Sequence, residues 1–218
     1  MSRKIFTFTQ LSNKLDSELA WRRKELTLLF NKVDSKITPI NTTLLRAAIP
    51  FIYAHWEGYV KIVAESYLEF VANKYEKYSE LKIQFVVLAI EKKFSSNNLS
   101  DIAKRVKMIE LLINEFDKKA NVPIKDVIQT KSNLWFDVFE EILFTIGLDT
   151  VDFTQFQTVV NDLVDTRNHI AHGHYIKVNY EAYENIHNDI ITAMTRLKTE
   201  IENAALLFKY RDTTKVAI

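Results

Sequence analysis

Apolar residues recur three and four positions apart along most of the chain, the spacing that gathers them on one face of an α-helix. The first run predicts a helix from about residue 9 to about residue 35, after a short β-like opening at Phe6-Thr7-Phe8. Arg22 falls on the apolar face of this helix, followed by Arg23 and Lys24. Three consecutive basic residues favour a solvated face over an RNA contact, so we expect these charges to lie in water.

A second long helix is predicted from about residue 44 to residue 75. Pro39 and the polar Asn41-Thr42-Thr43 precede it as a turn and an N-cap. Pro50 lies inside it and should either kink the helix or mark its true start. The same helix carries Tyr53-Ala54-His55-Trp56-Glu57-Gly58-Tyr59-Val60-Lys61, where aromatic, ionisable and glycine residues are concentrated as they are not in an ordinary bundle helix.

Five further helices complete the pattern. They are predicted from a cap at Ser79 to Phe94, from a cap at Ser100 to Phe116, from a cap at Ser132 or Asn133 to Gly147, from Asp152 or Thr154 to Ala171, and from Tyr180 to Phe208. The polar Ser95-Ser96-Asn97-Asn98 predicts a loop between the third and fourth helices. The tail from Arg211 is expected to fray.

The composition agrees with long helices and few turns. Of the 218 residues, 47% are hydrophobic and 26% charged, with only three glycines and three prolines. No change in composition, flexible linker or internal repeat divides the chain. We therefore expect one all-α domain over residues 1–218, an up-and-down helical bundle over about 42–208 with an additional N-terminal helix and the fourth helix as an insertion.

Cysteine content and charge narrow the class of protein. The absence of cysteine excludes disulfides and thiolate metal sites and suits a reducing compartment. The start has no apolar core of signal-peptide length and no later run could span a bilayer, so we expect a cytoplasmic protein with no membrane partner. A net charge of +1 leaves any RNA binding to local patches. The most basic region comprises Lys104, Arg105, Lys107, Lys118 and Lys119, which we expect to be exposed helix charges, with a partner or RNA surface as the alternative.

Three of the five histidines lie in the segment 165–175. The helical pattern places Arg167 on the apolar stripe, where a guanidinium needs a partner or a cleft. Glu57 is either that buried partner or a surface glutamate. Asn168 lies one turn before His172 on a neighbouring stripe and can orient its ring. Gly173 should end the helix, so that Arg167 and His172 emerge close together.

Several kinds of chemistry can be weighed for this segment. His169, His172 and His174 invite a metal, but no Glu-x-x-His pattern accompanies them and Arg167 adds positive charge, so neither metal nor cofactor is expected. Cysteine is absent, no serine lies near the histidines, and no glycine-rich phosphate loop occurs.

Arginine with histidine and no metal fits RNA cleavage by the 2′-hydroxyl group of the RNA itself. His172 would serve as acid or base and Arg167 would hold the phosphate. One imidazole does not easily do both jobs, so a symmetric partner would complete the site. The spacing alone favours the other interpretation, a helix-ending histidine and an arginine in a buried salt bridge.

The motif Arg167-Asn168-x-x-Ala171-His172-Gly173 resembles the Arg-x4-His signature of the HEPN superfamily (higher eukaryotes and prokaryotes nucleotide-binding domain), in the form with asparagine after the arginine. The stretch 53–61, Ser132-Asn133-Leu134, Ile146-Gly147-Leu148 and the spacing to the last helix are similar to a bacterial HEPN subgroup associated with defence and toxin loci. The resemblance covers about residues 40–205.

This resemblance implies a helical bundle that forms a homodimer and acts as a metal-independent endoribonuclease, with RNA as substrate and an antitoxin or defence-system protein as a further partner. It makes Arg167 and His172 the catalytic pair. The supporting residues are Asn168, Asp165, Glu57, His169, His174 and Tyr175. Some HEPN toxins have a tyrosine two residues after the histidine, where this chain has His174 and then Tyr175. Other HEPN domains are non-catalytic modules that bind a nucleotide or a protein, and this alternative stays open.

Overall fold

The structure, a computed structural model, describes residues 4–94 and 101–212, and this part is all-helical. The elements are α1 (Phe8–Phe30), α2 (Pro39–Ala72), η1 (Tyr78–Glu80), α3 (Ile83–Phe94), α4 (Asp101–Glu115), α5 (Phe136–Thr145), η2 (Val151–Phe156), α6 (Gln157–Ala171) and α7 (Tyr180–Leu206). The predicted all-α fold class is therefore confirmed. No described helix is long and apolar enough to cross a membrane.

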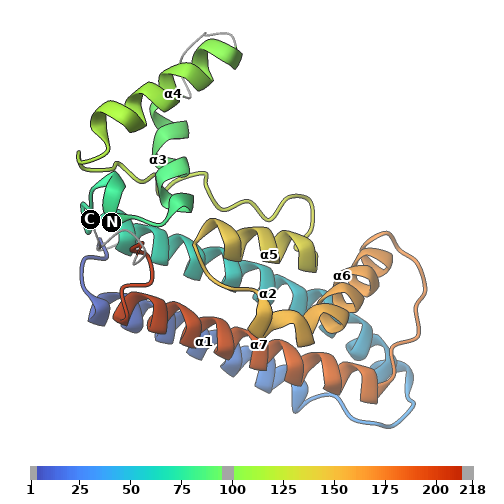
Figure 1. Cartoon of the computed structure of the whole chain (residues 1–218). Helices are drawn as coiled ribbons and strands as arrows, with labels where there is room; N and C mark the ends of the chain where they lie inside the picture. Colours follow the sequence, from blue (N-terminus) through green and yellow to red (C-terminus); the bar gives the residue numbers. More distant parts are fainter. Residues whose placement is uncertain (1–3, 95–100, 213–218) are drawn as a thin grey trace.

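Three long helices, α1, α2 and α7, pack against one another and form the body of the molecule (Figure 1). α5, η2 and α6 cover one side of this body, with α6 against both α2 and α7. An aromatic cluster joins them, because the Trp56 ring of α2 lies 5.1 Å from Phe139 of α5, and Phe139 lies 5.3 Å from Phe153 of η2. These buried rings hold α6 in place, and α6 carries the Arg-x4-His motif.

The expectation that Arg22 is solvated is wrong, although Arg23 and Lys24 are exposed. Only 3% of Arg22 is exposed, and its guanidinium forms an ion pair with Glu18 while lying 4.2 Å from the centre of the Trp21 ring. Gly58 of α2 faces it, and a Cβ atom there would come within 3.5 Å of Arg22 Nη2. The apolar stripe of α1 can therefore include a buried arginine, because a carboxylate and an aromatic ring lie beside its guanidinium.

Several predicted boundaries of the first two helices are corrected. The β-like opening is an N-cap, since Thr7 is extended, its side chain accepts from the Gln10 N–H, and the helix starts at Phe8. α2 begins at Pro39, because Thr38 caps it and proline suits the first helical position. Pro50 therefore lies inside the helix and does not mark its start.

The later helices also begin at other residues than the predicted caps. Ser79 lies in η1, and α3 starts at Ile83. The predicted loop at 95–98 and the cap at Ser100 lie outside the described residues. α5 starts at Phe136, two residues beyond Leu134, whose N–H is bound by the Tyr53 hydroxyl. The sequence also predicted an α-helix from Asp152 or Thr154, but the 3-10 turn η2 occupies that stretch.

Both predicted glycine helix ends are confirmed. Gly147 and Gly173 have φ values of +70° and +78°, the left-handed region that glycine adopts without a steric penalty. The tail was expected to fray from Arg211, but the structure shows this residue held in place. Arg211 Nε donates to Glu76 Oε1 at 3.0 Å, and the preceding Tyr210 is buried. Residues 213–218 lie outside the described part.

Candidate functional site

Arg167 is held by side chains from three parts of the chain. Its Nη1 donates to Asn133 Oδ1 at 2.6 Å and to Asn168 Oδ1 at 2.8 Å. Its guanidinium carbon lies 4.3 Å from the centre of the Tyr53 ring. Side chains of α6, α2 and the segment before α5 therefore fix the direction of the guanidinium together. This agrees with the expectation that an arginine on the apolar stripe of α6 needs a partner or a cleft.

None of these partners carries a negative charge. The described residues place no carboxylate within 4.0 Å of the Arg167 nitrogens, so of the two alternatives for Glu57 the ion pair with Arg167 is not formed. Nη1 supplies only two of the five N–H donors of a guanidinium. The half-buried Arg167 thus keeps its full positive charge and several donors for an anion.

Glu57 acts on the tyrosine beneath the arginine. Burial raises the pKa of Tyr53, and the nearby Glu57 charge raises it further, although the Leu134 N–H and the Arg167 charge oppose this. The Tyr53 hydroxyl therefore stays protonated, accepting from Leu134 N–H at 2.9 Å. Glu57 and Tyr53 support the face on which Arg167 rests, which gives Glu57 an indirect place in the site.

The long motif on α2 is divided between different neighbours. Tyr53 and Glu57 face the Arg167 site, whereas His55 faces α1, with its ring 5.2 Å from Trp21 and its Nε2 3.3 Å from Glu25 Oε2. Burial lowers the pKa of His55, against the effect of Glu25. Because successive helical residues point in different directions, one unusual stretch of sequence serves two interfaces.

Asn168 orients the arginine and not the histidine, which corrects the expectation for its side chain. Its Oδ1 accepts from Arg167, and only its backbone carbonyl accepts from the His172 N–H, at 3.0 Å. His172 is the C-cap residue of α6, and its exposed ring has no hydrogen-bond partner among the described side chains. The imidazole is therefore accessible at the end of the helix that carries Arg167.

The loop after α6 folds back onto the helix and onto α2. His169 Nδ1 lies 3.1 Å from His174 Nδ1, and His169 Nε2 lies 3.7 Å from Asp165 Oδ2. Arg46 of α2 donates from Nη2 to the His174 carbonyl at 3.1 Å and lies 5.0 Å from the centre of the Tyr175 ring. Side chains from two helices, His169 of α6 and Arg46 of α2, therefore fix the chain beyond His172.

Sequence reasoning missed three residues of this site. Asn133 was weighed as a helix cap and Tyr53 as part of an aromatic stretch, both also within the HEPN resemblance but without a role in the site, and Arg46 was not singled out. A signal for Arg46 exists, because it lies seven residues before Tyr53 and so shares one face of α2 with it. No local pattern pairs Asn133 with Arg167, since the two lie 34 residues apart.

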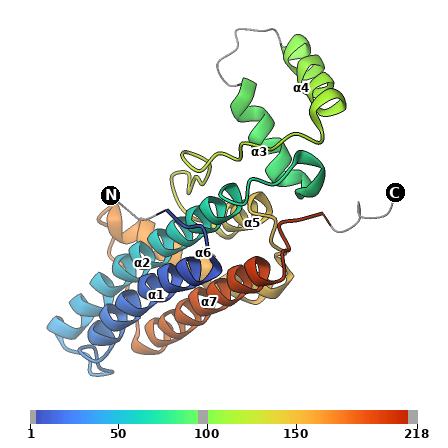
Figure 2. The same cartoon turned by 90° about the vertical axis from the view of Figure 1, so that its left-hand side faces the viewer.

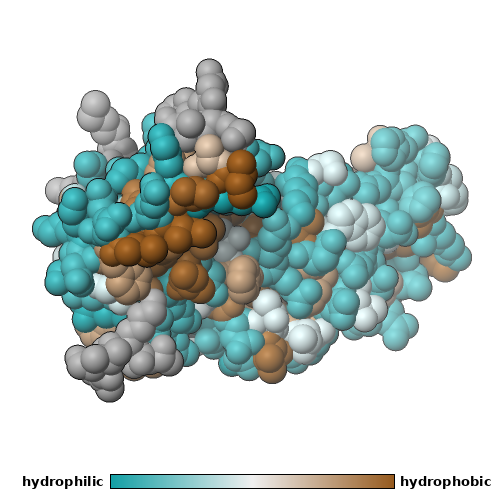
Figure 3. All heavy atoms as spheres, turned by 45° about the horizontal axis from the view of Figure 1, so that its top comes forward, coloured by the Kyte–Doolittle hydropathy of each residue, from teal (hydrophilic) through white to brown (hydrophobic). Residues whose placement is uncertain are grey.

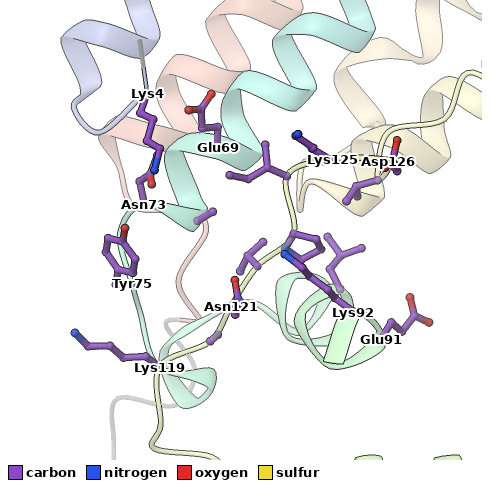
Figure 4. A pocket seen from close by; sticks show the side chains of 17 residues that line it. Lys4, Glu69, Asn73, Tyr75, Glu91, Lys92, Lys119, Asn121, Lys125 and Asp126 are labelled. Atoms are coloured by element: carbon purple, nitrogen blue, oxygen red, sulfur yellow. The ribbon is translucent and has the colours of Figure 1, made fainter. Parts of the chain in front are cut away.

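One hollow lies beside this site and another lies away from it. One of about 460 Å³ lies between α6 and α7, where Asp162, Asp165 and Asp189 make it acidic and unsuited to an RNA backbone. Asp165 thus lines a groove beside the site. The second, of about 1320 Å³, is lined by charges of both signs and by residues 119–127 and contains none of the predicted site residues (Figure 4).

Within residues 4–94 and 101–212, no group of three or more His, Cys, Asp or Glu side chains is arranged to hold a metal ion. His169 and His174 approach each other, but His172 does not join them in any contact that the described residues make. The roles of Asp165, His169, His174 and Tyr175 in a reaction stay predictions.

A protein-family model matches most of the chain. No curated protein and no solved structure matches the chain. The family model RiboL-PSP-HEPN matches residues 17–203, beginning inside α1, so the N-terminal helix expected as an addition lies largely within the family's extent. HEPN domains are RNase-type or nucleotide-binding modules. Since the match spans well over half of the 218 residues and includes the Arg167 site, the chain belongs to the RiboL-PSP-HEPN family.

Proposed function

We propose that the protein is a metal-independent endoribonuclease of HEPN type, with Arg167 and His172 as its catalytic residues. The observation that carries the proposal is the environment of Arg167. Two amide oxygens and a neutral tyrosine ring orient the guanidinium without neutralising it. A structural arginine in a half-buried position would normally have a carboxylate partner, because an unpaired charge there is costly. Arg167 is instead prepared for an anion, and an RNA phosphate supplies one.

The reaction needs a base, an acid and charge stabilisation. The base takes the proton of the RNA 2′-hydroxyl, and the 2′-oxygen attacks the neighbouring phosphorus. The bond to the 5′-oxygen of the next nucleotide breaks, and that oxygen takes a proton from the acid. The products are a 2′,3′-cyclic phosphate and a 5′-hydroxyl end. Arg167 donates hydrogen bonds to the non-bridging oxygens, whose charge grows in the transition state.

One imidazole would have to be both base and acid within a single chain. A homodimer that joins the C-terminal ends of two α6 helices supplies a second His172, and with it the missing acid. The exposure of the His172 ring and the absence of a fixed partner for it suit such a composite site. The biological setting we propose is that of a toxin or anti-phage effector, held in check by an antitoxin or defence-system protein.

A second candidate is a non-catalytic module that binds a nucleotide through Arg167. It is favoured by one observation, because no side chain orients the His172 ring. In that case the uncompensated guanidinium would hold the phosphate and no bond would break.

The test measures cleavage of a labelled RNA by purified wild-type protein and by Arg167→Ala and His172→Ala. The proposal expects both substitutions to abolish cleavage, a chelator to leave wild-type activity intact, and the wild-type product to end in a cyclic phosphate. Lys177→Ala is the matched control, since it removes an exposed charge from the loop beside the site. Binding of RNA without cleavage by the wild type would favour the nucleotide-binding module, and retained cleavage by both variants would exclude the site.

A further inference from the structure

α4 stands apart from the bundle. Among the described elements its main contact is with α3, and both helices project from one end of the three long helices (Figures 1 and 2). Leu111 is buried on the face of α4 that packs on α3, with Met108 and Leu112 partly buried beside it. This face is enough to attach the helix. It leaves the opposite face without a partner among the described residues.

The opposite face is also apolar. Ile102, Val106, Ile109 and Ile113 are 69%, 47%, 57% and 74% exposed. Their spacing of four, three and four residues gives one straight stripe along the helix. Large apolar side chains form a continuous band over this part of the surface (Figure 3). Single exposed apolar residues are ordinary, but a contiguous stripe of β-branched side chains marks an interaction surface.

The spacing is that of the seam of a coiled coil. Written as heptads, Ile102 and Ile109 take position d, and Val106 and Ile113 take position a. Leu111 then falls at position f, opposite the seam, which agrees with its burial against α3. The helix therefore has one face for its own chain and one for another helix.

Charge beside the seam indicates what that other helix is. Arg105 takes position g and Glu110 takes position e, both exposed. In a parallel coiled coil, position g of one helix meets position e of the next heptad on its partner. Two copies of α4 in parallel and in register would therefore form two symmetric pairs between Arg105 and Glu110. An unrelated partner would need this complementarity supplied separately.

We propose that α4 is a self-association surface, on which α4 of a second copy packs in parallel and in register. The stripe is short, spanning about 17 Å at 1.5 Å per residue. Two heptads alone make a marginal contact, so the association is weak or adds to another interface. α4 lies far along the molecule from α6 (Figure 1). A chain that also paired at Arg167 would therefore assemble beyond a dimer, and the two interfaces are independent.

The sharpest test uses the absence of cysteine from the sequence. Ile109→Cys, a position-d variant, places two identical residues opposite each other only in the parallel in-register arrangement, within the range of Cα distances that a disulfide spans. We expect this full-length variant to form a covalent dimer rapidly under mild oxidation. Ile37→Cys is the matched control, because Ile37 is 86% exposed and lies outside α4. Equal rates for the two variants would overturn the proposal.

A second measurement follows the mass of the full-length protein by analytical ultracentrifugation over a dilution series. Ile109→Asp should lower the average mass, and because the residue faces water in a lone chain, its helical circular dichroism should match the wild type. Arg105→Glu or Glu110→Arg alone should weaken association by on the order of tenfold, and the double variant should restore it. Failure of the double variant to recover would overturn the register. A wild-type mass that Ile109→Asp leaves unchanged would overturn the interface, whether or not RNA is cleaved.

Discussion

Two arginines interrupt apolar helical stripes in this protein, and the structure uses them differently. Arg22 of α1 is buried and paired with the Glu18 carboxylate. Arg167 of α6 is half-buried and paired with two neutral amide oxygens. Each also lies over an aromatic ring, at 4.2 Å from Trp21 and 4.3 Å from Tyr53. Besides burial, the difference between them is one negative charge on a partner.

That charge separates a residue that stabilises the fold from one that is ready to bind. The Glu18 carboxylate neutralises Arg22 and closes its surroundings to other anions. The amides around Arg167 fix its direction and leave its charge for a ligand. An arginine on an apolar stripe therefore has to be judged by the charge of its partners as well as by its burial.

The largest effect is expected from Arg22→Ala, which empties a buried position of α1 and leaves Glu18 with Lys14 as its remaining cationic partner. The free energy of unfolding should fall by about 3 kcal/mol. Arg167→Ala should lower it by less than about 1 kcal/mol, because only neutral partners are left behind. Urea denaturation followed by circular dichroism measures both. A larger loss of stability in Arg167→Ala than in Arg22→Ala would reverse the comparison.

The Glu18 carboxylate should make stability depend on acid pH. Burial raises the pKa of Glu18, but hydrogen bonds from Lys14, Arg22 and Trp21 outweigh it and lower the pKa to about 2. A folded-state pKa below the unfolded value gives stability that is complete above about pH 4.5 and is lost as the pH falls toward 2. Glu18→Gln should remove about 2 kcal/mol at neutral pH and flatten this part of the pH profile. Denaturation curves at several pH values test this, and an unchanged profile in the variant would contradict it.

Asn133→Asp should give Arg167 a carboxylate partner, as Arg22 has in Glu18. The substitution puts a carboxylate 2.6 Å from the guanidinium, where the amide oxygen now lies. RNA affinity should fall by roughly tenfold, while the protein stays folded. Ser132→Asp is the control, since it adds the same charge at the exposed neighbouring residue. Equal losses in the two variants would mean that general repulsion, and not pairing with Arg167, is responsible.

The smallest effect is expected from Arg46→Ala, which releases the loop beyond His172 from α2. We expect a decrease of roughly threefold in kcat for RNA cleavage, since the loop keeps its contact between His169 and His174. Single-turnover kinetics measure it. Arg46→Gln, which keeps a donor for the His174 carbonyl, should lose less activity than the alanine variant, and the opposite ranking would exclude this positioning role.

Local sequence patterns predicted the helices of the fold well, but they did not predict which side chains contact Arg167. The helical period predicted all seven α-helices of the described residues, and Gly147 and Gly173 predicted two helix ends, because these signals act over one or two turns. Helix starts were displaced where long-range contacts act, as at Leu134, whose N–H is taken by Tyr53 from 81 residues away.

The sequence predicted where the candidate site lies but not how its side chains are arranged. The position of Arg167 on an apolar stripe showed that it needs partners, and the motif gave His172. The identity of those partners depends on how the segment before α5 crosses α6, which no local pattern contains. Glu57 was therefore weighed on charge alone, as the partner or as a surface glutamate, whereas in the structure its charge acts on Tyr53.

The central claim is that Arg167 keeps an uncompensated charge for an RNA phosphate. The most direct measurement is the equilibrium affinity of the wild type and of Arg167→Ala for an RNA whose 2′-hydroxyls are methylated, which binds but does not react. The account predicts that Arg167→Ala binds at least about tenfold more weakly, with a smaller dependence of affinity on salt. Equal affinity and an equal salt dependence in the two proteins would contradict it.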